Sequence, residues 1–161
     1  MGEEAIQLLD LGKLRDIEQD LVDQLDVSMV LSCFMCRTCT SSCPVTFAQP
    51  RFNPLAIIRL VAYGFIDEVL SSDMVWLCSS CYSCQERCPQ GIPIADFMNK
   101  LKNCAVQKGY APAGVRAQMD LIRTSGRIYP LDDFDNKKRV KAGLPSLPTS
   151  CEIVEKLLDR A

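Results

Sequence analysis

Residues 33–44 read CFMCRTCTSSCP, and residues 78–89 read CSSCYSCQERCP. Both stretches follow one pattern, in which four cysteines are separated by two, two and three residues and the last is followed by proline. Each cysteine of the second run lies 45 residues after its counterpart in the first, as Cys78 follows Cys33. A twelve-position pattern that recurs with its proline is strong support for an internal repeat. The eight cysteines are Cys33, Cys36, Cys39, Cys43, Cys78, Cys81, Cys84 and Cys88.

The composition of the chain excludes several classes of protein. Its 161 residues suit one modest domain with arms or two very small lobes, and 48% hydrophobic with 24% charged residues excludes general disorder. A net charge of −2 gives no support for nucleic-acid binding. No stretch approaches the roughly 20 apolar residues that span a bilayer. The chain has no histidine, which removes the commonest general base and any histidine-ligated metal site.

Ten cysteines in such a chain favour metal binding over disulfides. The N-terminus shows no secretory signal, so we expect a cytoplasmic protein in a reducing compartment, where structural disulfides are rare. The pattern C-x2-C-x2-C-x3-C-P is the ligand signature of bacterial ferredoxins that hold two [4Fe–4S] clusters, and in them the fourth cysteine ligates the other cluster. Transferred to these positions, the signature predicts two [4Fe–4S] clusters. One has the ligands Cys33, Cys36, Cys39 and Cys88, and the other has Cys78, Cys81, Cys84 and Cys43.

Zinc is the main alternative metal. A structural zinc site needs four ligands, commonly two C-x2-C pairs, so the eight cysteines could supply two zinc sites. Zinc gives no reason for a third cysteine at the same spacing or for a proline after both runs. We therefore favour iron–sulfur clusters over a zinc-stabilised adaptor without a redox role, and a disulfide framework is less favoured still.

The segments around the cysteine runs have helical patterns, and no stretch alternates convincingly as a strand. Asn53 and Pro54 form a typical helix start, and that helix is expected to close at Gly64. Further helices are expected after Pro93 and from about residue 113 to Gly126, with shorter segments at 67–77 and 151–159. The residues expected on apolar faces are Leu14, Ile17, Leu21 and Leu25; Leu55, Ile58 and Ala62; Ile94, Phe97, Met98, Leu101 and Ala105; and Val115, Met119 and Ile122.

The predicted fold is therefore all-α, with two cluster loops set between helices. The 45-residue repeat is longer than that of compact β-rich bacterial ferredoxins, and it resembles the α-helical ferredoxin module of iron–sulfur subunits in several oxidoreductase complexes. We divide the chain into an N-terminal amphipathic helical segment (1–28), an α-helical ferredoxin domain (29–126) and an extended C-terminal arm that contains proline and lysine (127–161), which is expected to dock on a partner subunit. No G-x-G-x-x-G or P-loop motif is present, so no nucleotide or flavin fold is indicated and no catalytic residue is assigned.

The cysteine runs and the stretch between them resemble the C subunit of the CoB–CoM heterodisulfide reductase of methanogens, over roughly residues 25–125. The resemblance rests on CFMCRTCTSSCPV from Cys33, on FNPLAIIRL from Phe52 and on WLCSSCYSCQERCPQGI from Trp76. It implies a small two-cluster protein that relays electrons between two other subunits of the reductase. The donor would be the flavin subunit, which carries FAD and iron–sulfur clusters. The acceptor would be the catalytic subunit, whose noncubane clusters cleave the CoM-S-S-CoB disulfide, in a complex joined to a hydrogenase or formate dehydrogenase. All eight family ligands are present.

Two other interpretations stay open at this point. The chain could be the iron–sulfur subunit of another oxidoreductase, such as a glycerol-3-phosphate, glycolate or lactate dehydrogenase or a sulfur-oxidising heterodisulfide-reductase-like complex. The other open interpretation is the zinc-stabilised adaptor without a redox role.

A few residues outside the ligand pattern allow two interpretations each. Cys104 is expected to pack as a small buried hydrophobe, whereas Cys151 is ambiguous. Arg37 and Arg87 lie within the cluster loops, where they could tune a potential or be ordinary exposed side chains. The basic run from Lys137 to Lys141 is expected to be a solvated part of the arm rather than a docking site.

Overall fold

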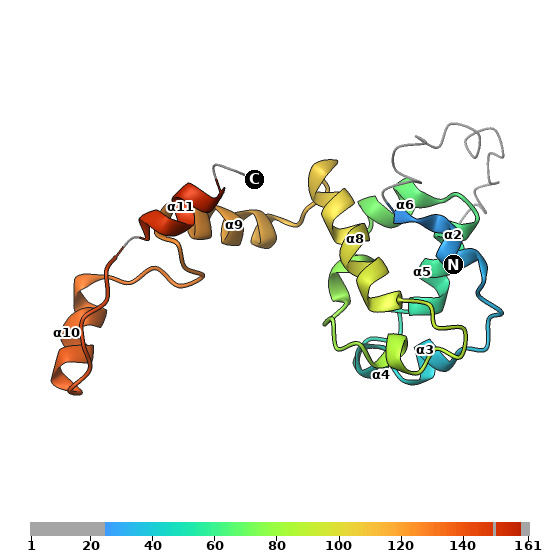
Figure 1. Cartoon of the computed structure of the whole chain (residues 1–161), viewed down its shortest axis with the longest axis horizontal. Coiled ribbons are helices and arrows are strands. Elements are labelled where there is room, and N and C mark those ends of the chain that lie inside the picture. Colours follow the sequence, from blue (N-terminus) through green and yellow to red (C-terminus); the bar gives the residue numbers. More distant parts are fainter. Residues whose placement is uncertain (1–24, 150, 159–161) are drawn as a thin grey trace, which may run out of the picture. The chain divides into compact units, whose positions relative to one another are not determined.

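The computed structural model describes residues 25–149 and 151–158. These residues form helices joined by turns and contain no strand, so the all-α prediction is confirmed for the described part of the chain. They fall into two compact units, with the boundary between Tyr110 and Ala111 (Figure 1). The sequence-based boundary after Gly126 stays a prediction of how the chain divides into domains. Of the apolar stripe predicted near the N-terminus, Leu25 is buried and the other three residues lie outside the described residues.

The first unit contains all eight cysteines of the two runs. Figure 1 shows α3 and α4 at the opposite end of this unit from α6. Its core gathers side chains from α5, α6 and α8, and burying a residue such as Phe97 stabilises the fold by roughly 1.5–3 kcal/mol. The elements among the described residues of this unit are α2 (Val27–Leu31), α3 (Thr38–Ser41), α4 (Pro44–Ala48), α5 (Pro54–Ala62), α6 (Ile66–Ser71), the 3-10 helix η2 (Met74–Leu77), α7 (Ser83–Glu86) and α8 (Ile94–Gln107).

Helix α5 begins where the sequence predicts. The Asn53 side chain accepts a hydrogen bond from the Ala56 amide (3.1 Å), which satisfies one of the unpaired N–H groups of the first turn. The same side-chain oxygen accepts a bond from the Thr40 hydroxyl (2.8 Å) and so ties α5 to α3. The apolar face predicted for this helix was narrower than the buried face in the structure. Helix α5 contacts three neighbours, α2, α3 and α6, and so buries more of its surface. Its fully buried residues are Pro54, Ile57, Ile58 and Val61, whereas Leu55 and Ala62 are half-buried.

The segment predicted over 67–77 is two elements rather than one. Helix α6 ends at Ser71, Ser72 is extended, and η2 begins at Met74. Hydroxyl groups compete with the helix here: Ser72 Oγ donates to the Val69 carbonyl (2.7 Å) and accepts from the Met74 amide (3.3 Å). Serine side chains bonded to the local backbone are a common cause of such helix ends.

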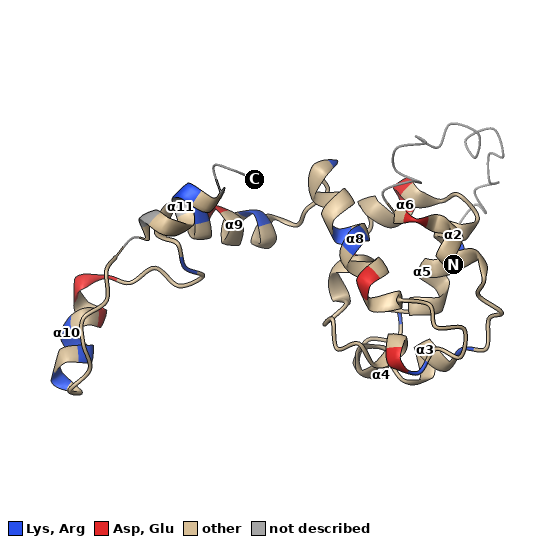
Figure 2. Cartoon of the chain, in the orientation of Figure 1, with Lys and Arg blue, Asp and Glu red and all other residues tan. Residues whose placement is uncertain are grey.

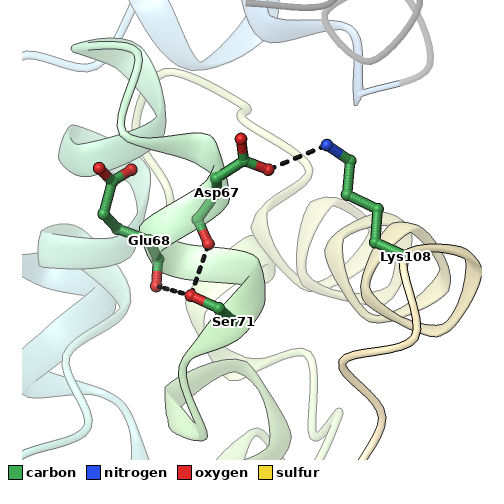
Figure 3. A network of polar contacts seen from close by, with 4 residues as sticks. All are labelled: Asp67, Glu68, Ser71 and Lys108. Carbon is green, nitrogen blue, oxygen red and sulfur yellow. Dashed lines mark hydrogen bonds and ion pairs between the residues drawn. The ribbon is translucent and has the colours of Figure 1, made fainter. Parts of the chain in front are cut away.

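Helix α8 is the longest of the described helices in the first unit, and its predicted apolar face is confirmed. Ile94, Phe97, Met98, Leu101 and Ala105 are all buried. Its C-terminal end is tied to α6 by an ion pair between Lys108 and Asp67 (2.9 Å), beside the Ser71 hydroxyl that bonds to the Asp67 carbonyl (Figure 3). An ion pair at such a surface position contributes about 1 kcal/mol or less, so the apolar face provides most of the attachment.

The second unit contains α9 (Ala113–Ser125), α10 (Asp133–Lys141) and α11 (Glu152–Leu158). Helix α9 ends at Gly126, as predicted, and its predicted apolar face (Val115, Met119, Ile122) is half-buried. Helix α10 was not predicted, because its apolar residues lack a helical period. Its charges nevertheless suit a helix dipole, with acidic residues in the first turn and basic residues in the last (Figure 2). The Asp132 side chain caps it by accepting from the Asp135 amide (2.7 Å).

Candidate metal centre

The two cysteine runs adopt the same unusual backbone conformation. Met35 and Arg37 in the first run, and Ser80 and Tyr82 in the second, have φ angles between 52° and 64°. These left-handed residues occupy equivalent positions, 45 residues apart. None is a glycine, so each conformation costs about 1–2 kcal/mol. Left-handed residues of this kind are typical of loops whose backbone N–H groups form a concavity suited to anions, including iron–sulfur clusters.

A short helical turn follows each loop and buries the third cysteine. Arg37 and Tyr82 are the N-cap residues of α3 and α7, which bury Cys39 and Cys84. Burial, the larger cause, and the thiol of Cys78 raise the pKa of Cys84 from 9.0 to about 11. The pKa of Cys39 is raised as well, mainly by burial.

The second cysteine of each run is exposed and lies beside a hydroxyl group. Thr38 Oγ1 lies 3.2 Å from Cys36 Sγ, and Ser83 Oγ lies 3.6 Å from Cys81 Sγ. Hydrogen bonds from Thr38 lower the pKa of Cys36, and the backbone and hydroxyl of Ser83 lower that of Cys81. Each loop therefore offers one thiol that ionises readily and one that is shielded from water.

Two cavities gather the eight thiols into two sets of four. Including the space open at their mouths, they measure about 340 and 310 Å³. In the part of the chain that the structure describes, no three Cys, Asp or Glu side chains converge closely enough to hold a single metal ion. The second-run cavity is lined by Cys78, Cys81, Cys84 and Cys43, and the first-run cavity by Cys33, Cys36, Cys39 and Cys88.

The fourth cysteine of each run thus lines the cavity of the other run, which is the arrangement that the ferredoxin signature predicts. The contacts between the runs explain the exchange. Helix α3 packs on α7, and the Arg87 guanidinium donates to the Ser42 hydroxyl (3.5 Å). Ser42 and Arg87 are themselves equivalent positions of the repeat. A contact between equivalent positions is expected near an internal two-fold axis. Such an axis would place the last cysteine of each run beside the first three cysteines of the other run.

The residues fit an iron–sulfur cluster in both cavities. Four thiols are available in each cavity, thiolates are the ligands that iron–sulfur clusters use, and the left-handed residues of both loops suit an anionic group. The cysteines outside the runs line neither cavity. Cys104 is buried in the core, as predicted, and burial raises its pKa. Cys151 is half-buried in the second unit next to Gly126.

The charged residues singled out in the sequence lie in different surroundings. Arg37 is exposed and contributes to the wall of the first-run cavity. Arg87 bonds across the repeat, as described above. The basic run on α10 is mostly exposed, as predicted, although Arg139 Nε donates to the Pro145 carbonyl (3.1 Å). Asn136 pairs with the backbone of Leu147 through two bonds of 2.9 Å, so the following segment folds back along α10.

Sequence reasoning missed one part of the site, which is a set of polar contacts between the second loop and α8. Gln85 Oε1 accepts bonds from the Ala95 and Asp96 amides (3.1 and 3.2 Å), which gives α8 an N-terminal cap from the cysteine run. Asp96, Asn99 and Lys102 also bond to the loop. Their i+3 spacing on α8 was the available signal, since such residues share one face.

A family model described as a 4Fe-4S dicluster domain matches residues 29–92, the segment that spans both runs. Fold, cavities and family model together define an all-helical protein of the two-cluster ferredoxin class, with two [4Fe–4S] clusters as its cofactors. No helix of the described residues is both long and apolar enough to cross a membrane.

Comparison with curated relatives narrows this class of two-cluster proteins to one family. The chain is 32% identical to the iron–sulfur C subunit of the CoB–CoM heterodisulfide reductase of Methanopyrus kandleri, across 92% of this chain and 77% of that protein. It is 42% identical to the C subunit of the ferredoxin:CoB-CoM heterodisulfide reductase of Methanosarcina mazei, across 76% and 75% of the two chains. The C subunit of the H(2):CoB-CoM heterodisulfide,ferredoxin reductase of Methanothermobacter marburgensis is 36% identical, across 72% and 62%. The chain belongs to this family, the iron–sulfur C subunits of heterodisulfide reductases.

Proposed function

We propose that this chain is the electron-transfer subunit of a cytoplasmic heterodisulfide reductase complex. Electrons would enter from the flavin subunit, which carries FAD and iron–sulfur clusters, and leave to the catalytic subunit, whose noncubane clusters reduce the CoM-S-S-CoB disulfide in methanogenesis. A hydrogenase or formate dehydrogenase would complete the assembly. The support for these partners is the chain's resemblance to relatives that are named as the C subunits of such reductases.

The observation that carries the proposal is the pair of thiol-lined cavities connected through α3 and α7. A relay needs two redox centres held at a fixed separation, and packing between two equivalent helical turns provides a rigid link. We assign Cys33, Cys36, Cys39 and Cys88 to one cluster and Cys78, Cys81, Cys84 and Cys43 to the other. Each bound [4Fe–4S] cluster accepts and donates one electron. The protein positions the thiolates and limits access of water.

The first test is metal and sulfide analysis of anaerobically purified protein, with electron paramagnetic resonance after reduction by dithionite. Two clusters require about eight iron and eight sulfide per chain and two interacting signals. Zinc without iron or sulfide would remove the electron-transfer function. The second test identifies the proteins that co-purify with the chain from its native source. Recovery of a different dehydrogenase in place of the flavin and catalytic subunits would overturn the assignment to this complex while leaving the relay chemistry intact.

A further inference from the structure

The loop of the second run is bonded to α8 through a line of three contacts, which we name the α8 seam. Lys102 Nζ donates to the Cys78 carbonyl (2.8 Å), Ser80 Oγ donates to Asn99 Oδ1 (3.0 Å), and the Tyr82 hydroxyl donates to Asp96 Oδ1 (3.1 Å). Every second loop residue meets every third helix residue, and the two segments run in opposite directions. Because the left-handed residues Ser80 and Tyr82 are both held, the seam offsets part of the cost of the loop conformation.

Among the residues that the structure describes, the first run provides an internal reference without such a seam. The positions equivalent to Ser80 and Tyr82 are Met35 and Arg37, and a methionine thioether cannot donate a hydrogen bond. Met35 is 51% exposed, and Arg37 is exposed as well. Two sites with equivalent thiols and equivalent backbone therefore differ in how their loops are supported and in the charges beside them.

Lys102 places a fixed positive charge next to the second-run cavity. Its ammonium group is half-buried and bonded to the carbonyl of Cys78, one of the four residues whose thiols line that cavity. Asp96 carries the opposite charge at the far end of the seam, but it is exposed and shares its carboxylate with Tyr82 and Gln85. Water screens an exposed charge more effectively than a half-buried one, so the Lys102 ammonium is screened less than the Asp96 carboxylate.

From this arrangement we propose that Lys102 is a positioning residue whose charge raises the reduction potential of the cluster held by Cys78, Cys81, Cys84 and Cys43. Reduction adds one negative charge to a cluster that is already anionic, and a nearby ammonium stabilises that charge. The bond to the Cys78 carbonyl keeps the ammonium at one place relative to the ligands. The inference rests on the proposed function in that the second-run cavity must hold a [4Fe–4S] cluster, and it adds a means by which the two clusters acquire different potentials.

The experiment is a potentiometric titration of the full chain followed by electron paramagnetic resonance, with iron and sulfide counted for every variant. Lys102→Met removes both charge and bond, and Lys102→Gln removes the charge but retains an N–H donor. Lys102→Arg retains the charge. The matched control is Lys100→Met, which removes the same charge from the same helix at a similar, half-buried position without the bond to Cys78.

We expect both neutral variants to shift one of the two midpoint potentials to more negative values, by at least twice the shift in Lys100→Met, and to leave the other close to its original value. Lys102→Arg should retain the original potential. Equal shifts in the Lys100 and Lys102 variants would overturn the proposal, as would a shift in Lys102→Met that is absent from Lys102→Gln. Loss of a cluster from all three Lys102 variants, including Lys102→Arg, would likewise overturn the proposal, because a retained charge would then not preserve the site. Absence of iron from the unsubstituted chain would instead refute the proposed function itself.

Discussion

At the scale of single residues, the second and third thiols of each run lie in different environments. The exposed Cys36 and Cys81 lie beside hydroxyl groups that lower their pKa values, whereas burial raises those of Cys39 and Cys84. A thiol must lose its proton to become a ligand, so cluster binding releases protons and weakens as the pH falls. The same local differences predict the order in which the thiols react when no cluster is present.

In the cluster-free chain near pH 8, we expect iodoacetamide to modify Cys36 and Cys81 well before Cys39 and Cys84. The thiolate is the nucleophile, and the first two thiols are both more acidic and more exposed. Peptide mapping by mass spectrometry measures the order, and circular dichroism reports whether the helices persist. Uniform modification at one rate, with the helices present, would contradict the environments described here.

The direction of the pH effect on stability follows from the same residues. Cys84, with its pKa raised from 9.0 to about 11, stabilises the cluster-free fold below pH 9, and this contribution is lost as the pH rises toward 11. Cys36 and Cys81 act in the opposite direction, because their lowered pKa values favour the fold above pH 9 and lose that effect as the pH falls. Urea denaturation of the cluster-free chain at pH 8 and pH 10.5 measures the sum of these contributions, and a smaller loss of stability at pH 10.5 in Cys84→Ser would isolate that of Cys84.

At the scale of elements, the cap of α5 connects a helix to a cluster loop. Asn53 accepts bonds from the Ala56 amide and from the Thr40 hydroxyl of α3. Asn53→Ala should lower the stability of the first unit by about 1–2 kcal/mol. Loss of a helix cap typically has a cost of this size, and the substitution also removes the bond from the Thr40 hydroxyl. Thermal unfolding under anaerobic conditions measures the change. Asn103→Ala, at an exposed position of α8, is the control and should change the unfolding temperature very little.

Helix packing in the second unit depends on one glycine. Gly126 ends α9 with a φ of 68°, and a Cβ atom added there would lie 2.5 Å from Cβ of Cys151, at the start of α11. Gly126→Ala should therefore destabilise the second unit by more than the roughly 1 kcal/mol expected from the backbone conformation alone. Limited proteolysis should show faster cleavage between residues 111 and 149. Gly114→Ala, where an added Cβ meets nothing within 4 Å, serves as the matched control.

At the scale of the whole molecule, the exchange of the fourth cysteine between the runs is the decisive feature. Cys43→Ser should damage the cluster that uses Cys78, Cys81 and Cys84, and Cys88→Ser the cluster that uses Cys33, Cys36 and Cys39. The reason is that Cys43 and Cys88 each line the cavity of the opposite run. Iron counts with electron paramagnetic resonance measure the loss, and Lys102→Met identifies the signal of the second-run cluster through its shifted potential. Damage by each variant to the cluster of its own run would disprove the ligand assignment while leaving the cofactor unchanged.

Much of this protein can be derived from the sequence, because the deciding signals are local. A cysteine pattern with its proline specifies the cofactor, and Asn53 with Pro54 marks the start of α5. The 3.6-residue period of α8 identifies its buried face. Each of these depends on residues within one loop or one helix, where spacing and side-chain chemistry are sufficient. Ser72 interrupts the helical segment over 67–77 because a hydroxyl competes with the helix, and the apolar pattern does not register that competition.

Only the tertiary structure decided which groups meet from distant parts of the chain. Cys43 lines the cavity of the second run because α3 packs on α7. From the sequence, this pairing could be predicted only by analogy with the ferredoxin signature. The α8 seam joins residues up to 24 positions apart, so no local period could reveal that Lys102 lies at the Cys78 carbonyl. Spacing along the chain thus determined the cofactor, whereas long-range packing determined which thiols share a cavity and which charge lies beside it.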